Sequence, residues 1–140
     1  MLTSEPTLLG QEWRTLQNNY EHYESNAFLI KLSAVALYLA AQVLLLNSLV
    51  TAAIILILWV QEGIFRTYQA RLGRRILRIE GLLKQAEPAI GAACQLHTHW
   101  LAERKGFSGL LAEYAASTAR PTVAFPYAVL LLLHVLAKVF

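Results

Sequence analysis

The side chains that could support catalysis or metal binding are few and scattered along the chain. Cys94, His97 and His99 are metal-ligating residue types that lie close in sequence. On a helix, however, His99 points away from both Cys94 and His97, and a fourth ligand is not evident. The chain contains no Asp, no Ser-His-Asp arrangement and no glycine-rich phosphate loop. The sequence therefore predicts that the protein is not an enzyme and holds neither a metal nor another cofactor.

Two charged residues stand apart from the others, because Lys31 and Glu62 enclose 30 residues without a charge. One membrane-spanning helix needs only about 20 apolar residues, so this stretch is long enough for two helices joined by a tight turn. Asn47 and Ser48 lie near its middle. Asn can close one helix in the left-handed conformation and Ser can cap the next. The predicted spans are 27–46 and 49–65.

Lys31 and Glu62 are equally distant from the predicted turn, so in a hairpin they should face one another near the membrane boundary. An unpaired charge there costs several kcal/mol, which favours an ion pair. The pair could fix the register of the hairpin or belong to an ion pathway. Neutral polar side chains in the spans also seek partners and could line a passage. The candidate pore-lining or gating residues are Gln42, Asn47, Gln61 and Glu62.

A third apolar stretch, 122–140, predicts a third spanning helix, although His134 and Lys138 interrupt it. His134 could face a pore or be a satisfied buried histidine. Most of the 12 Lys and Arg residues lie between 61 and 120, and cytoplasmic segments collect such residues. The N-terminus and segment 66–120 are therefore expected in the cytoplasm. Segment 1–26 lacks the basic start of a cleaved signal peptide. A multi-pass protein of the cell inner (plasma) membrane is predicted.

Apolar and aromatic residues recur in threes and fours on both sides of the hairpin, which predicts amphipathic helices. One helix covers 1–26, and the second span is expected to continue as a rod to about residue 87, where Pro88 ends it. Shorter helices are predicted over 89–104 and 108–119. A near-heptad seam on the rod must be buried by the same chain or by other copies, and we expect a homo-oligomer. The seam residues are Phe65, Tyr68, Leu72, Ile76, Ile79 and Leu83.

Five arginines lie off this seam, next to the predicted membrane surface. There a basic residue gains roughly 1 kcal/mol from anionic headgroups, so the lipid bilayer is the expected partner. These residues are Arg66, Arg71, Arg74, Arg75 and Arg78. Nucleic acid is not the expected partner, because no aromatic platform or recognised binding module accompanies the charge.

The composition agrees with a membrane protein. Of the 140 residues, 56% are hydrophobic and 15% are charged, against about 25% charged in an ordinary soluble domain. A single Cys excludes a disulfide framework. The fold class is therefore predicted as an all-α integral membrane protein, with 1–140 forming a single domain.

One part of the chain resembles a known family. The segment Tyr20-Glu21-His22-Tyr23-Glu24 leads into the hairpin, and the second span leaves it through Trp59-Val60-Gln61-Glu62-Gly63-Ile64-Phe65-Arg66. Over about residues 15–85 this pattern resembles the small SLATT membrane proteins, which have two spans and a cytoplasmic helix. The resemblance implies an oligomeric effector of bacterial antiviral defence that forms pores or disrupts membranes. It also implies a cytoplasmic sensor protein encoded nearby.

Two functions follow from the sequence as hypotheses. The first is a self-assembling pore-forming or membrane-perturbing protein whose cytoplasmic helices assemble or gate it. The alternative is a non-conducting membrane anchor or scaffold subunit of a larger enzyme or transporter complex. The number of copies in detergent and ion leak from vesicles would distinguish them.

Overall fold

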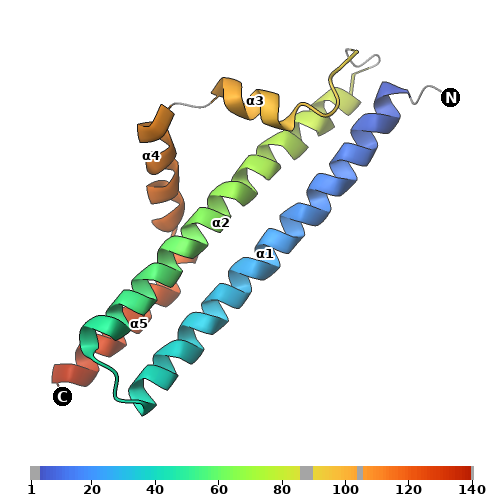
Figure 1. Cartoon of the computed structure of the whole chain (residues 1–140). Helices are drawn as coiled ribbons and strands as arrows, with labels where there is room; N and C mark the ends of the chain where they lie inside the picture. The colour runs from blue at the N-terminus through green and yellow to red at the C-terminus, as the bar shows by residue number, and fades with distance from the viewer. Residues whose placement is uncertain (1–3, 86–89, 104–105, 140) are drawn as a thin grey trace.

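The computed structural model describes residues 4–85, 90–103 and 106–139. These form helices and no strand, which confirms the predicted all-α class (Figure 1). The helices are α1 (Glu5–Val43), α2 (Ser48–Leu83), α3 (Leu96–Glu103), α4 (Gly106–Thr118) and α5 (Pro121–Val139). Helices α1 and α2 form an antiparallel hairpin. We call the end with the connecting turn the turn end, and the end with the N-terminus the open end.

Helix α1 is one continuous helix of 39 residues, about 58 Å long at 1.5 Å per residue. The separate segments expected over 1–26 and 27–46 are therefore a single element. No Gly or Pro lies between residues 20 and 30 to interrupt the helical hydrogen bonds. Because α1 is about twice as long as a hydrocarbon core is thick, only part of it could cross a membrane.

The turn differs from the prediction, because it occupies residues 44–47 rather than 47–48. Leu45 adopts the left-handed conformation, with φ of 52°. The side-chain oxygen of Asn47 accepts a hydrogen bond from the backbone N–H of Leu49 at 2.8 Å. Asn47 therefore caps the start of α2, where free N–H groups need acceptors, and Ser48 is the first helical residue.

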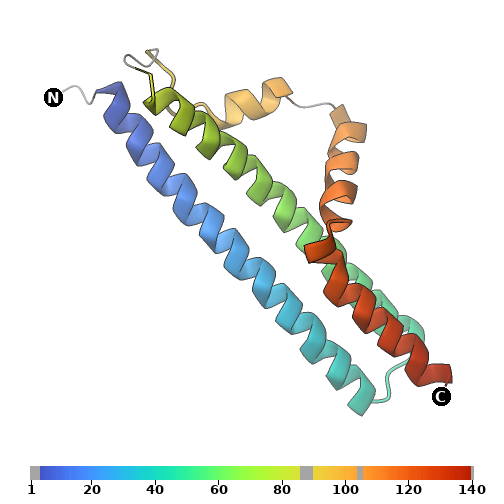
Figure 2. The ribbon, with the colours of Figure 1, turned by 180° about the vertical axis from the view of Figure 1, so that it is seen from behind.

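Helix α5 lies beside the turn-end halves of α1 and α2, as Figures 1 and 2 both show. Its buried residues recur at spacings of four, three and four: Val123, Tyr127, Leu130 and His134. Tyr127 and Leu130 of this stripe pack in one cluster with Ala34 and Tyr38 of α1 and Ile55 of α2. The predicted third span thus corresponds to α5, which packs against both helices of the hairpin.

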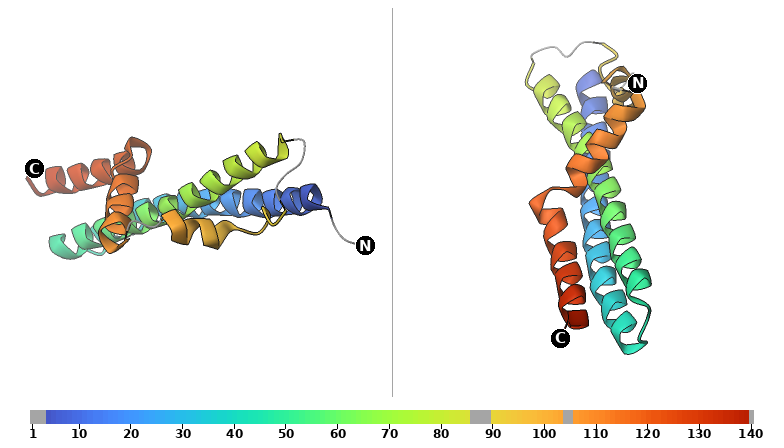
Figure 3. Two further views of the ribbon diagram at one scale, coloured as in Figure 1. Left: turned by 90° about the horizontal axis from the view of Figure 1, so that it is seen from above. Right: turned by 90° about the vertical axis from the view of Figure 1, so that its left-hand side faces the viewer.

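Helix α4 crosses α2 and ends against it (Figure 3). Contact is close because Gly63 has no side chain, and a Cβ there would collide with Thr118. Trp59 Nε1 donates to the carbonyl oxygen of Thr118 at 3.0 Å, and Thr67 Oγ1 donates to Ser117 Oγ at 2.8 Å. Helices α3 and α4 begin at Leu96 and Gly106, against the predicted 89 and 108. Helix α2 ends at Leu83, with Lys84 as its C-cap, so the rod predicted to reach about residue 87 is shorter than expected. Pro88, which was expected to end it, lies outside the described residues.

The open-end half of the hairpin has its own core. Leu9 and Leu16 of α1 pack against Ile76 and Ile79 of α2, and Leu72 lies against the same cluster. The α1 residue Tyr23 contacts two further seam residues: its ring stacks on Tyr68 and meets the ring of Phe65 in a tilted arrangement. Two seam residues, Tyr68 and Leu83, are each 41% exposed. The seam is therefore covered chiefly by α1 of the same chain, one of the two arrangements that the sequence left open, and does not require a second copy.

Three helices are long and apolar enough to cross a membrane, namely α1, α2 and α5. Only 22% of the most apolar window of each is buried within the chain. Large apolar side chains consequently cover the outside of the turn-end half. This apolar belt includes Phe28, Leu32, Leu39, Val43, Leu49, Ile57, Phe125, Leu132 and Val135. So large an exposed apolar surface is typical of a protein surface that contacts lipid or another protein.

Candidate functional site

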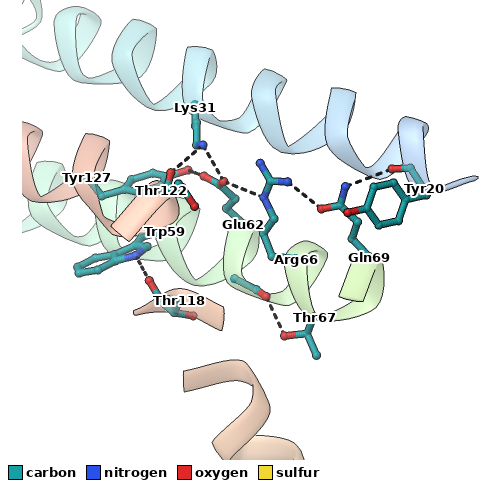
Figure 4. Close-up of polar contacts among 11 residues, drawn as sticks. Tyr20, Lys31, Trp59, Glu62, Arg66, Thr67, Gln69, Thr118, Thr122 and Tyr127 are labelled. Atoms are coloured by element: carbon teal, nitrogen blue, oxygen red, sulfur yellow. Dashed lines mark hydrogen bonds and ion pairs between the residues drawn. The ribbon is translucent and has the colours of Figure 1, made fainter. Parts of the chain in front are cut away.

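A buried polar cluster lies where α1, α2 and the start of α5 meet (Figure 4). Glu62 is at its centre, with its side chain fully buried. Lys31 Nζ of α1 lies 3.2 Å from Glu62 Oε1, and Arg66 Nε, one turn along α2, lies 3.5 Å from the same oxygen. Tyr127 of α5 donates a hydrogen bond to Glu62 Oε2 at 2.9 Å. The ion pair predicted from the symmetric positions of Lys31 and Glu62 is thus present.

Lys31 also binds α5 through a backbone group. Its Nζ donates to the carbonyl oxygen of Thr122 at 3.0 Å. In a regular helix that carbonyl would accept from the N–H four residues later, but residue 126 is a proline inside the helix and has no N–H. Pro126 therefore leaves the Thr122 carbonyl free, and Lys31 supplies the missing donor. We call Lys31, Glu62, Arg66, Thr122 and Tyr127 the junction cluster.

The junction cluster carries two cationic side chains for one carboxylate. Both cations approach Glu62 Oε1 at ion-pair distance without hydrogen-bond geometry, since neither Glu62 Oε1 nor Arg66 Nε has a hydrogen-bond partner. The side chains of Lys31 and Arg66 are 22% and 19% exposed. The buried carboxylate is thus compensated, and a surplus positive charge faces outward on the side of the two cations.

Aromatic and polar side chains hold the cluster in place on both sides. The indole of Trp59 stacks on the ring of Tyr127, with centroids 6.0 Å apart and planes at 7°. Arg66 Nη1 donates to Gln69 Oε1 at 2.7 Å, and Gln69 Nε2 donates to the backbone oxygen of Tyr20 at 3.3 Å. The carboxylate of Glu62 is therefore fixed relative to α1, α2 and α5.

A second polar group lies near the turn end, around the buried His134 of α5. Its ring nitrogens share hydrogen bonds with Ser48 Oγ at 2.7 Å and with Gln42 Nε2 at 3.4 Å. Tyr38 contacts the imidazole edge-on, with ring centroids 6.2 Å apart. His134 is thus a hydrogen-bonded buried residue that ties α5 to both helices of the hairpin.

The four candidate pore-lining residues do not share a surface. Glu62 is enclosed in the junction cluster, Gln42 binds His134, and Asn47 caps α2. Gln61 is exposed on α2, and Asn47 is exposed as well. A passage lined by this set is therefore not formed within one chain.

Three of the five predicted lipid-binding arginines are instead engaged in the protein. Arg75 is buried and forms two hydrogen bonds with Glu12, at 2.8 and 2.9 Å. Arg66 belongs to the junction cluster. Arg71 pairs with Glu113 at 3.1 Å. The side chains of Arg74 and Arg78 are half exposed, at 53% and 50%, and form longer ion pairs with Glu113 and Glu103, at 3.8 and 3.9 Å. Sequence spacing placed these residues off the seam but could not reveal acidic partners on other helices.

A cleft of about 480 Å³ lies between α2, α3 and α4, and Arg71 stands at its wall. The guanidinium of Arg71 lies over the rings of Tyr68 and Trp100, at 5.2 and 4.9 Å from their centroids. Burial raises the pKa of Tyr114 above its ordinary value. Glu113 already neutralises Arg71. Arg74 Nη2 also lies 3.8 Å from Glu113 Oε1. The cleft therefore presents paired charges rather than a free cationic or anionic site.

Among the residues that the structure describes, no group of three or more His, Cys or acidic side chains could hold a metal ion. Cys94 is exposed and precedes α3. Its backbone N–H donates to Glu12 Oε2 at 2.8 Å, so its neighbourhood is part of the Glu12–Arg75 contact.

Sequence reasoning missed the contributions of Trp59, Thr122 and Tyr127. Pro126 carried a signal for one of them, because a proline inside a helix frees the carbonyl four residues earlier. Gly63 likewise indicated a close approach by another element. Neither signal identifies which helix supplies the partner, so the position of α5 had to come from the structure.

Comparisons of the chain with protein-family models, curated proteins and solved structures find no match. The resemblance to SLATT proteins, with its implied role in antiviral defence and its sensor partner, therefore stays a prediction from the sequence pattern.

Proposed function

We propose that the protein is an integral membrane protein with three spanning helices, and that it acts as a non-conducting anchor or scaffold. Its turn-end half is inserted in the bacterial inner membrane. Its open-end half, together with α3 and α4, forms a helical platform at the cytoplasmic face. The platform offers a binding surface to other components of a larger complex.

The observation that carries this proposal is the direction in which polar and apolar side chains point. In the turn-end half, the polar residues Thr51, Glu62 and His134 are buried inside the single chain, while the apolar belt faces outward. Charged residues in a membrane are tolerated when they face the protein interior and are paired. A channel-forming chain would instead turn its polar side chains toward a shared lumen.

The basic residues support the orientation. Arg74 and Arg78, half exposed, lie on the open-end side of the junction cluster, and basic residues beside a span favour the cytoplasmic side. The cluster itself lies at the level where α5 begins, which suits a boundary between hydrocarbon and headgroups. In this arrangement the N-terminus is cytoplasmic and the C-terminus is on the far side.

The native cysteine allows a direct test of topology, because Cys94 is the single cysteine of the chain and is exposed. A membrane-impermeant maleimide should label it in inside-out vesicles and leave it unlabelled in intact spheroplasts. The control is Cys94→Ser combined with Lys138→Cys, which should show the reverse pattern. Labelling of both positions from one side, or release of the protein by alkaline carbonate without detergent, would overturn the proposed insertion.

Conduction is tested separately with vesicles that contain the purified protein and a trapped dye. We expect a monomer or small assembly by mass measurement, and no leak. A closed ring of identical chains that releases the dye would instead support the pore-forming effector predicted from the sequence. In that case Gln61, exposed on α2, would be the first residue to test as pore-lining.

A further inference from the structure

A hollow of about 470 Å³ opens next to the junction cluster, between α1 and α2. It is lined by Glu21, Glu24, Ser25, Phe28, Lys31 and Arg66. Four of these residues follow one another along α1 at spacings of three, four and three, so they lie on one face of the helix. The hollow is therefore a continuous groove along α1, with Arg66 contributed by the facing helix.

The charges in this groove are ordered along the axis of α1. At the deeper end Lys31 and Arg66 share one carboxylate, which leaves a surplus positive charge. The ammonium of Lys31 has three N–H donors. It forms the ion pair with Glu62 and donates to the carbonyl oxygen of Thr122. Among the described residues, Arg66 donates a single side-chain hydrogen bond, from Nη1 to Gln69 Oε1 at 2.7 Å, so its other terminal nitrogen keeps its donors. Hydrogen-bond donors therefore remain for an anionic group.

The outer end of the groove has the opposite charge. Glu21 and Glu24 lie about two to three helical turns from Lys31, on the side away from the apolar belt. Within the described part of the chain, neither carboxylate forms an ion pair. Glu21 accepts one hydrogen bond, from Gln17 Nε2 at 3.1 Å. The carboxylates of Glu21 and Glu24 are therefore available to bind a cation from outside the chain.

We propose that this groove binds the headgroup of a zwitterionic aminophospholipid, with phosphate at Lys31 and Arg66 and primary ammonium at Glu24 or Glu21. The inference rests on the proposed membrane insertion. The order of charges matches such a lipid, whose phosphate lies deeper in the bilayer than its amine. Phe28 is largely exposed in the same groove and offers apolar contact to the start of the acyl chains.

The charge pattern distinguishes this lipid from the other common headgroups. An anionic headgroup without an amine would satisfy Lys31 and Arg66 but face the two carboxylates with no compensating cation. A choline headgroup carries a cation without N–H donors, so it cannot form charge-assisted hydrogen bonds with Glu21 or Glu24. A primary ammonium can donate to either carboxylate.

Native mass spectrometry of the full chain in mild detergent tests the proposal. Phosphatidylethanolamine, phosphatidylcholine and phosphatidylglycerol with the same acyl chains are added in equal amounts. We expect phosphatidylethanolamine to be retained about tenfold over the other two, the factor of one charge-assisted hydrogen bond. Glu21→Gln with Glu24→Gln should abolish that preference, because the amides bind an ammonium less well.

Glu103→Gln is the matched control, since it removes an exposed carboxylate on α3 and should leave the preference unchanged. The two groove carboxylates are exposed, so their variant should fold, which circular dichroism verifies. Equal retention of the three lipids, preference for phosphatidylglycerol, or an unchanged preference in the double variant would overturn the proposal. If Cys94 labelling still reports an inserted protein, that failure concerns the lipid site alone. Loss of insertion would remove the proposed function as well.

Discussion

The contact between Lys31 and Glu62 makes a quantitative prediction, since two elements of the hairpin meet there through opposite charges. We consider Lys31→Met, Glu62→Gln and the double variant. At 3.2 Å and an effective dielectric constant of about 20, the attraction amounts to about 5 kcal/mol before desolvation. Arg66 competes for the same oxygen and Lys31 is partly solvated. The net coupling should therefore be about 1–3 kcal/mol, the range for directly contacting residues.

The two single variants should differ in cost. Glu62→Gln leaves two cations side by side at a buried position, so we expect a loss of about 3–5 kcal/mol of unfolding free energy. Lys31→Met leaves the carboxylate with Arg66 and the hydroxyl of Tyr127, so its cost should be smaller. The double variant should be less destabilised than the sum of the two, because the second change removes a partner that is already lost.

The unfolding free energy can be measured by titrating the protein in mild detergent with dodecyl sulfate. Far-UV circular dichroism reports the helices. Tryptophan fluorescence reports the packing around Trp13, Trp59 and Trp100, and Trp59 contributes the signal of the junction because its ring stacks on Tyr127. Arg78 and Glu103, 3.9 Å apart and both at least half exposed, provide a control cycle. There we expect only about 0–1 kcal/mol of coupling. The reasoning fails if the losses of unfolding free energy in Lys31→Met and Glu62→Gln sum to that of the double variant within about 0.5 kcal/mol. The pairing would then not contribute to stability.

Four further changes test the packing of the hairpin and of the junction cluster. Gly63→Ala should lower the free energy of unfolding by about 1–3 kcal/mol in the same titration, because its methyl group collides with the end of α4. Gly81→Ala should instead raise it by up to about 1 kcal/mol, because a methyl group there meets nothing within 4 Å. Glu12→Gln should cost about 3–5 kcal/mol by leaving a buried arginine unpaired, and hydrogen exchange at the Cys94 amide should become faster; unchanged exchange would contradict that contact. Pro126→Ala supplies an N–H to the carbonyl that Lys31 now binds, so the cost of removing the lysine should fall, and an unchanged cost would refute the role given to the proline.

The hairpin and its central ion pair could be predicted because charges are scarce in the apolar part of the chain. Between Lys31 and Glu62 no other charged residue competes as a partner, and an antiparallel hairpin brings equidistant residues to the same level. A four-residue turn leaves this symmetry nearly unchanged, which is why a wrong position for the turn still predicted the correct pair. Asn47 is favourable at either end of a helix, so local propensity alone could not choose between closing α1 and capping α2.

The arginine-rich stretch could not be interpreted in the same way. Spacing on a helix predicts which residues share a face, but a partner such as Glu12 or Glu113 lies on a different helix. Arg75 and Arg78 are three residues apart and look equivalent in the sequence, yet one is buried against Glu12 and the other is half exposed. The difference arises because α1 runs to the far open end of the hairpin, which a division into 1–26 and 27–46 did not anticipate.

The choice between one chain and several copies depends on polar atoms rather than on apolar ones. An apolar helix face gains little free energy by exchanging lipid for protein. The apolar belt of α1, α2 and α5 is therefore compatible with a monomer or with a ring of copies. Polar groups are more selective, because each buried donor or acceptor needs a partner at a defined position. Lys31, Glu62 and His134 find those partners within a single chain. A pore built from several copies would have to open these contacts first. Dye release from vesicles by Glu62→Gln, together with none by the unchanged protein, would therefore identify the junction cluster as the contact that keeps such a pore closed.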